Sequence, residues 1–268
     1  MTVAILGAGV MGETVVSGLV RAGRKPADLL MSERRAARAA ELQERYGVDV
    51  VSNVDAARKA DTLMLVVKPQ DMPDLLDEIA PVVKPGQLVV SLAAGITTGY
   101  IEGRLTDGVP VVRVMPNTPA LVDEGMAAIS RGSHCDEAHL VEAEELLRAT
   151  GKVIRVPEKQ QDAVTAISGS GPAYLFFVVE AMIEAGVHLG LPRSTATELV
   201  IQTMVGSAKL LRETGEHPTV LRERVTSPGG TTAAAVRELE DHKVRAAFMT
   251  ALESARDRSR ALARGDDE

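Results

Sequence analysis

Residues 227–232 carry the groups best suited to hold a small anion. The segment reads Ser-Pro-Gly-Gly-Thr-Thr, and the strong helix formers of residues 233–239 follow it directly. Because proline and two glycines interrupt a helix that then starts again, free backbone N–H groups and two threonine hydroxyls gather at a helix amino terminus. This combination predicts a carboxylate site. An ordinary capped helix start, with Thr231 or Thr232 near the N-cap, is the competing interpretation.

A second candidate site lies near the amino terminus, where Gly7, Gly9 and Gly12 follow an apolar run and precede a helical pattern. With this spacing, Gly7 allows a tight turn, Gly9 lets a pyrophosphate approach the backbone, and Gly12 lets the helix pack closely on the strand. The helix start supplies N–H groups to the phosphates. The sequence therefore predicts a dinucleotide site, with a glycine turn that holds no ligand as the alternative.

The residues that follow the second apolar run bear on the choice between NAD and NADP. Glu33 lies 21 positions beyond Gly12, where a carboxylate accepts a hydrogen bond from the ribose 2′-hydroxyl and favours NAD. Arg34 and Arg35 are suited to clamp a 2′-phosphate instead, which favours NADP. A third alternative is that Glu33 pairs with a neighbouring arginine and is silenced.

The first half of the chain has the pattern of a doubly wound α/β domain. Continuous apolar runs, typical of strands covered on both faces, lie at 3–6, 29–32, 48–51, 63–67, 88–92, 111–115 and 126–129. Helical patterns alternate with them at 11–22, 34–46, 71–79 and 137–150. Loops at 67–69, 93–95 and 115–119 follow strands, so we expect them at the ligand-binding edge of a parallel sheet.

The chain beyond Pro157 predicts only helices. Residues 172–190 are apolar on nearly every side, so we expect this helix to be buried with help from a partner subunit. Further helices are predicted at 191–214 and 243–263, with a frayed tail at 265–268. We therefore predict a Rossmann-type dinucleotide-binding domain at 1–157 and an all-α substrate-binding and dimerisation domain at 158–268.

The composition argues against several classes of protein. The chain of 268 residues has a net charge of −7, without the basic stripe of a nucleic-acid binder. A single cysteine, Cys135, indicates a reducing compartment, and its polar neighbours predict a surface loop rather than a nucleophile. No stretch approaches the roughly 18 apolar residues of a membrane span, and the histidines lack metal-ligand spacing. We expect a soluble cytoplasmic protein without a metal site.

Two further segments are specific to one family. Residues 168–174 read Ser-Gly-Ser-Gly-Pro-Ala-Tyr, and residues 225–232 run into Glu-Leu-Glu at 238–240. Together with the glycine turn and the loops after the strands, they resemble the pyrroline-5-carboxylate reductase family over nearly the whole chain. The resemblance implies reduction of Δ1-pyrroline-5-carboxylate to L-proline, the final step of proline biosynthesis, with NADPH or NADH. It also implies an intertwined homodimer that is often assembled into larger rings.

The resemblance also implies roles for numbered residues. The substrate contacts that it implies are Ser227, Gly229, Gly230, Thr231 and Thr232, with Thr232 as the catalytic residue. The cofactor contacts, to which the end of the second strand is added, are Leu6, Gly7, Ala8, Gly9, Val10, Met11, Gly12, Ser32, Arg34, Asn53, Val66, Val67, Lys68, Pro69, Ala93, Ala94 and Gly95. We favour NADPH because the reduction is biosynthetic, and NADH is the alternative.

Three other functions compete with this prediction. A β-hydroxyacid dehydrogenase needs a proton acceptor for alcohol oxidation, and the lysine that serves such enzymes is missing from residues 171–190. A reductase of a related cyclic imine is a second possibility. A non-catalytic nucleotide-binding scaffold is a third, and the intact segment 227–232 argues against it.

Overall fold

The computed structural model describes residues 1–264 and divides the chain into two compact units. The first unit contains Met1–Ser170 together with the end of the last helix from Ala255 onward. The second unit contains Gly171–Ser254. The predicted tail at 265–268 lies outside the described residues.

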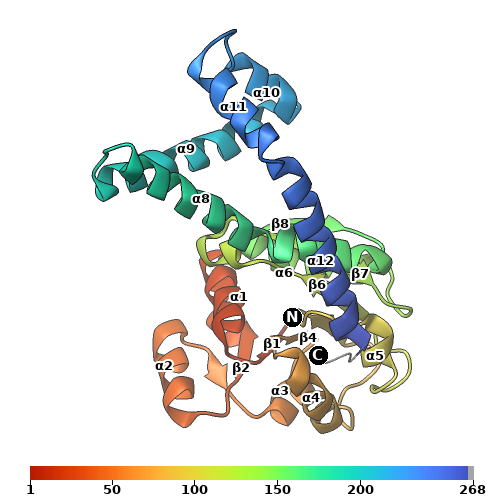
Figure 1. The fold of residues 1–268 in the computed structure, drawn as a ribbon. Helices are drawn as coiled ribbons and strands as arrows, with labels where there is room; N and C mark the ends of the chain where they lie inside the picture. The colour runs from red at the N-terminus through yellow and green to blue at the C-terminus, as the bar shows by residue number, and fades with distance from the viewer. Residues whose placement is uncertain (265–268) are drawn as a thin grey trace. The chain divides into compact units, whose positions relative to one another are not determined.

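An eight-stranded sheet forms the first unit, in the order β3-β2-β1-β4-β5-β6-β7-β8 (Figure 1). All neighbouring strands are parallel except β6 and β7. The connection from β6 to β7 is too short for a parallel crossover, so this pair is antiparallel. The strands are β1 (Val3–Leu6), β2 (Leu29–Ser32), β3 (Asp49–Val50), β4 (Thr62–Leu65), β5 (Leu88–Ser91), β6 (Val111–Met115), β7 (Gly125–Arg131) and β8 (Gly151–Arg155). The doubly wound α/β prediction is confirmed.

Helices cover both faces of this sheet and create two apolar cores. Val16 of α1, Leu42 of α2 and Leu140 of α6 belong to one buried cluster. Ala56 of α3 and Leu76 of α4 belong to the other, on the opposite face. Strands buried on both faces explain why the apolar runs of the sequence are continuous. The helices are α1 (Val10–Arg21), α2 (Ala36–Tyr46), α3 (Asn53–Lys59), α4 (Met72–Ile79), α5 (Thr98–Glu102), α6 (Glu137–Leu147) and α7 (Gln161–Val164).

Residues 158–170 pack with the sheet unit although they are helical. The Glu158 carboxylate accepts hydrogen bonds from the Thr98 N–H and hydroxyl, both at 2.8 Å. The buried Gln161 amide donates to the Ala128 carbonyl at 3.2 Å and the Ser130 hydroxyl at 2.8 Å. The compact units therefore divide after residue 170, whereas the predicted boundary after 157 follows the change from strands to helices. The functional division into 1–157 and 158–268 stays a prediction.

The second unit is made of helices, and its two longest helices pair with each other. A Cβ added to Gly186 of α8 would lie 2.9 Å from the Ala196 Cβ of α9, so glycine permits their close approach. Its helices are α8 (Gly171–His188), α9 (Arg193–Thr214), α10 (Pro218–Arg224), α11 (Thr231–Asp241) and the first half of α12 (Val244–Arg264).

In a single copy of the chain α8 is largely exposed, and its predicted burial with help from a partner subunit stays a prediction. Phe176 and Phe177 are 67% and 72% exposed, and only Pro172 and Gly186 of this helix are buried. The helical run Glu158–His188 also has the length and composition of a membrane span, with a mean hydropathy of 1.4, contrary to the expectation that no segment approaches one. The interior helix of a soluble protein passes the same test, so this property alone does not decide what covers α8.

Candidate active site

The glycine turn between β1 and α1 has space for a side chain at Gly9 but none at Gly7 or Gly12. Gly7 has φ +109°, and a Cβ on it would lie 2.5 Å from the Val66 carbonyl oxygen. A Cβ on Gly12 would collide with the Gly7 carbonyl oxygen, whereas one on Gly9 would have no atom within 4 Å. Gly7 and Gly12 are therefore required by the fold, and the space at Gly9 is free for a ligand to approach the backbone.

The start of α1 at this turn is able to bind an anion. Gly9 is the N-cap residue, and no side-chain hydrogen bond caps the helix in the part of the chain described. The first intrahelical bond runs from the Glu13 N–H to the Gly9 carbonyl at 2.9 Å. The N–H groups that precede Glu13 in α1 are thus available to phosphate oxygens, which the helix dipole also favours.

The loops after β1, β4 and β5 meet at one edge of the sheet, as the sequence predicts. In the strand register Leu6 is opposite Leu65, which is opposite Ser91. The backbone continues this pairing beyond the strand ends, because the Val66 N–H donates to the Leu6 carbonyl and the Leu92 N–H to the Leu65 carbonyl. The sheet therefore places the starts of the predicted cofactor loops at 66–69 and 93–95 next to the glycine turn. Their individual contacts with a cofactor stay predictions.

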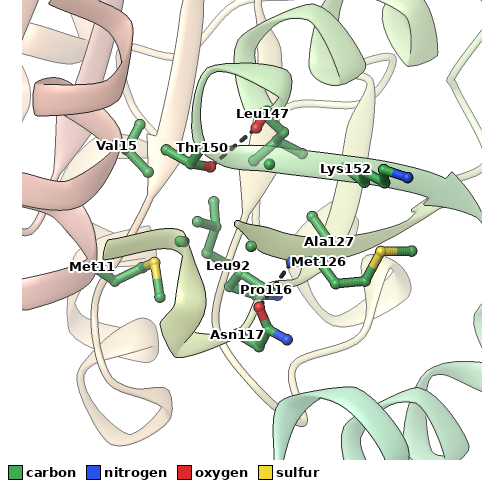
Figure 2. A pocket seen from close by; sticks show the side chains of 13 residues that line it. Met11, Val15, Leu92, Pro116, Asn117, Met126, Ala127, Leu147, Thr150 and Lys152 are labelled. Atoms are coloured by element: carbon green, nitrogen blue, oxygen red, sulfur yellow. Dashed lines mark hydrogen bonds between the residues drawn. The ribbon is translucent and has the colours of Figure 1, made fainter. Parts of the chain in front are cut away.

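A small pocket lies beside this edge, between the start of α1 and the loop after β6 (Figure 2). Met11, Leu92, Pro116 and Asn117 are among its lining residues. The Asn117 side chain holds the loop: its Oδ1 accepts from the Met126 N–H at 2.8 Å, and its Nδ2 donates to the Ser168 carbonyl at 3.2 Å. Sequence reasoning placed this loop on the ligand edge but named no site residue in it. Asn117 lies two residues after the end of β6, and that position is the sequence feature that could have marked it as a candidate site residue.

The end of β2 carries the residues that bear on the choice of cofactor. The register places Ser32 opposite Leu6, so Glu33 and the glycine turn both begin directly after paired strand ends. The Ser32 hydroxyl bonds the Asn53 amide oxygen, and the Asn53 amide donates to Glu78 at 2.7 Å. The structure therefore brings Ser32 and Asn53 together at the predicted adenosine end of the site.

Glu33 is paired with Arg35, as one of the three alternatives from the sequence requires. Its carboxylate accepts from the Arg35 backbone N–H at 2.9 Å and from the Arg35 guanidinium at 3.2 and 3.4 Å. The Arg35 side-chain hydrogen bond outweighs burial and lowers the pKa of Glu33. Arg34 is exposed, and it has no ion pair among the described residues. The negative charge of Glu33 is thus neutralised by Arg35, whereas the positive charge of Arg34 is not neutralised by a neighbour among the described residues.

A second carboxylate, Glu13, fixes α2 against α1. It accepts from the Tyr46 hydroxyl at 2.8 Å and from Arg45 at 2.7 Å, and it pairs with Arg38. Burial opposes its ionisation, but the hydrogen bonds from Tyr46 and Arg38 outweigh that effect, and the pKa of Glu13 is lowered. This ion-pair cluster helps to hold the helix that follows Arg34 and Arg35.

The predicted carboxylate site lies at the start of α11 in the second unit. Gly229 has φ +67°, and a Cβ on Gly230 would collide with the Ser227 hydroxyl. Gly230 is the N-cap residue, and Thr231 follows it directly, so the threonines lie near the cap as the competing interpretation expects. No side-chain hydrogen bond caps α11 among the described residues. The N–H groups of its first turn, up to Ala233, therefore remain available for an anion.

Cys135 lies in a surface loop, as predicted, with Ser133, His134 and Asp136 exposed, but its own side chain is buried. It is 4% exposed, and its thiol donates to the Val111 carbonyl at 3.1 Å. Burial raises the pKa of this thiol, which makes it a poor nucleophile. Among residues 1–264 there is no group of three or more His, Cys, Asp or Glu side chains that could hold a metal ion.

Comparisons with known proteins show which family the chain resembles. A family model for pyrroline-5-carboxylate reductase dimerisation matches residues 158–262, and one described as NADP oxidoreductase coenzyme F420-dependent matches residues 2–95. Pyrroline-5-carboxylate reductases from Corynebacterium melassecola and Mycobacterium tuberculosis are 45% and 44% identical to this chain. The alignments cover 97% of this chain in both cases, and 98% and 96% of the two relatives.

Solved structures give the same result over the whole fold. A pyrroline-5-carboxylate reductase from Coxiella burnetii has a TM-score of 0.93 and 37% identity, and the match covers 97% of this chain and 98% of that one. The Plasmodium falciparum enzyme, solved with NADP bound, has a TM-score of 0.88 and 29% identity, with 98% of each chain covered. This chain belongs to the pyrroline-5-carboxylate reductase family.

Proposed function

We propose that this chain reduces Δ1-pyrroline-5-carboxylate to L-proline, the final step of proline biosynthesis, with NADPH as the hydride donor. The observation that carries the proposal is the start of α11, where Gly229 and Gly230 have geometries that favour glycine and uncapped N–H groups follow. The substrate is a carboxylate, and a helix amino terminus of this kind is suited to bind one. The glycine turn of the first unit supports binding of the nucleotide.

The residues around 230 have separate tasks in this mechanism. The N–H groups of the first turn of α11 and the Ser227 and Thr231 hydroxyls hold the substrate carboxylate. The Thr232 hydroxyl bonds the ring nitrogen and orients the imine. NADPH, when bound, supplies a hydride to the imine carbon. A protonated imine becomes a neutral amine on receiving the hydride, so positioning and electrostatics are sufficient and no strong enzymic acid is needed.

NADPH is the proposed donor for two reasons. The amino-terminal half matches an NADP oxidoreductase model, and the relative from Plasmodium falciparum was solved with NADP. In this chain Glu33 is neutralised by Arg35, whereas Arg34 is exposed and suited to a 2′-phosphate. The cofactor contacts proposed for 6–12, 66–69 and 93–95 rest on the loop positions described above.

We propose that this chain forms a soluble, cytoplasmic homodimer with no nucleic-acid or membrane partner. We also propose that the dimers assemble into larger rings. The exposed apolar face of α8 lies within the segment that matches the dimerisation model, which favours a second copy over lipid as its cover. Burial of such a face contributes about 25 cal/mol per Å² of apolar surface removed from water.

A Phe177→Glu substitution is expected to convert the dimer to monomers. Phe177 is 72% exposed in one copy, so the single chain tolerates the change, whereas a carboxylate in an apolar interface loses its hydration. Light scattering coupled to size exclusion would measure the mass. Lys209→Glu, at an exposed polar position of α9, is the control and is expected to leave the mass unchanged. A Phe177→Glu variant that remains dimeric would exclude this face as the interface.

The activity is tested by mixing the protein with pyrroline-5-carboxylate and either NADPH or NADH and following the absorbance of the reduced nicotinamide. Oxidation that depends on the imine, with NADPH faster than NADH, is the expected result. The same assay with cyclic imines of a different ring size tests the alternative function, because faster oxidation with one of them would favour a reductase of a related imine. No oxidation with either cofactor would contradict the proposal and favour a nucleotide-binding scaffold.

A further inference from the structure

We propose that Arg35 is a positioning residue that selects NADP over NAD by holding the Glu33 carboxylate away from the adenosine ribose. The inference rests on the proposed use of NADPH and adds the residue that makes it possible. Glu33 occupies the position where a carboxylate that recognises the ribose diol of NAD is expected, 21 residues beyond Gly12 and directly after β2, whose last residue, Ser32, is opposite Leu6.

The geometry shows that this carboxylate is already occupied. Its Oε1 accepts from the Arg35 backbone N–H and Nε, and its Oε2 accepts from Nη2. The Glu33 side chain is only 9% exposed, whereas the Arg35 side chain that bonds it is 73% exposed. Arginine therefore lies on the solvent side of the pair. A ribose hydroxyl has to displace these charge-assisted hydrogen bonds to reach the carboxylate.

The pairing also changes the charge that a 2′-phosphate meets. An unpaired Glu33 anion next to the ribose would repel a phosphate, because like charges at this separation oppose binding. In the pair, the charges of Glu33 and Arg35 cancel. The exposed Arg34 then contributes a net positive charge at the end of β2. The site therefore recognises a 2′-phosphate although it retains the acidic residue that is typical of NAD sites.

A direct contact between Arg35 and the phosphate is the alternative, and a double-mutant cycle separates the two. If Arg35 acts through Glu33, removing Arg35 has little effect on cofactor choice once Glu33 is neutral. If Arg35 touches the phosphate, its removal weakens NADP binding equally in both backgrounds, because the two changes are then independent.

The test measures the dissociation constants of NADP⁺ and NAD⁺ by isothermal titration calorimetry on the intact protein. Arg35→Ala is expected to lower the preference for NADP⁺ over NAD⁺ by about tenfold, the scale of one lost charge interaction. Glu33→Gln alone is expected to keep the preference for NADP⁺. Adding Glu33→Gln to Arg35→Ala is expected to restore the preference that Arg35→Ala lowers. Arg35→Lys is expected to retain part of the preference for NADP⁺, since a lysine ammonium is able to form one ion pair with the Glu33 carboxylate.

Arg193→Ala is the matched control. It removes an arginine from an exposed carboxylate pair with Glu184 in the second unit, and it is expected to leave the preference unchanged. An equal loss of NADP⁺ affinity in the presence and absence of Glu33 would overturn the proposal, as would an equal weakening of both cofactors. Because the titration needs no imine, these outcomes are independent of whether the reductase assay succeeds.

Discussion

A Gly9→Ala variant is expected to fold as the parent does and to bind NADP⁺ on the order of 100-fold more weakly, about 2.8 kcal/mol. The added methyl group meets no protein atom within 4 Å, and the extended backbone of Gly9, with φ −68° and ψ −173°, suits alanine. The space that the methyl group fills is the approach of the pyrophosphate to the backbone. Calorimetry of unfolding and titration with NADP⁺ measure the two effects separately.

Two other glycines provide the controls for this variant. Gly12→Ala places its methyl group against the Gly7 carbonyl and is expected to destabilise the fold by about 1–3 kcal/mol, the usual cost of overpacking. Gly99→Ala, in α5, adds a methyl group in open space and is expected to change neither stability nor cofactor affinity appreciably. A Gly9→Ala variant that binds NADP⁺ as tightly as the parent would show that no phosphate lies at this position.

Continuous apolar runs predicted the strands of the parallel sheet, because burial on both faces leaves a clear sequence pattern. The same criterion failed for β8, whose residues Lys152, Ile154 and Arg155 are exposed at the edge of the sheet. The helices α3 and α5 were also missed. They are seven and five residues long, too short for a clear periodicity, although Ser52 and Thr97 cap them.

Contacts between distant segments set the limits of prediction for the candidate sites. Polar neighbours predicted the surface loop around Cys135, but they did not indicate that its thiol is buried and donates to the carbonyl of Val111 on β6. The sequence offered three states for Glu33, and the choice among them depends on the rotamer of Arg35, which no spacing rule specifies. In contrast, Gly7, Gly12, Gly229 and Gly230 were predictable, since a positive φ angle or a close contact at each of them admits few other residues.

A Thr232→Ala variant is expected to lower kcat about 100-fold, the scale of removing one preorganised hydrogen-bonding group at a reacting centre. Thr232 is the second residue of α11, in the turn whose free N–H groups are proposed to hold the carboxylate. NADP⁺ affinity is expected to stay unchanged because the proposed cofactor contacts are elsewhere in the chain. Thr232→Ser keeps the hydroxyl and is expected to retain most of the turnover.

Thr219→Ala is the matched control, because Thr219 is the second residue of α10 as Thr232 is of α11. There the His217 ring accepts from the Thr219 N–H at 3.3 Å, so the helix start is already capped. Loss of the Thr219 hydroxyl is expected to leave kcat unchanged. Near-normal turnover in Thr232→Ala would remove the hydroxyl from the mechanism and leave the backbone N–H groups to position the substrate. A raised KM with unchanged kcat would assign Thr232 to binding alone, since uniform binding changes KM without changing the chemical step.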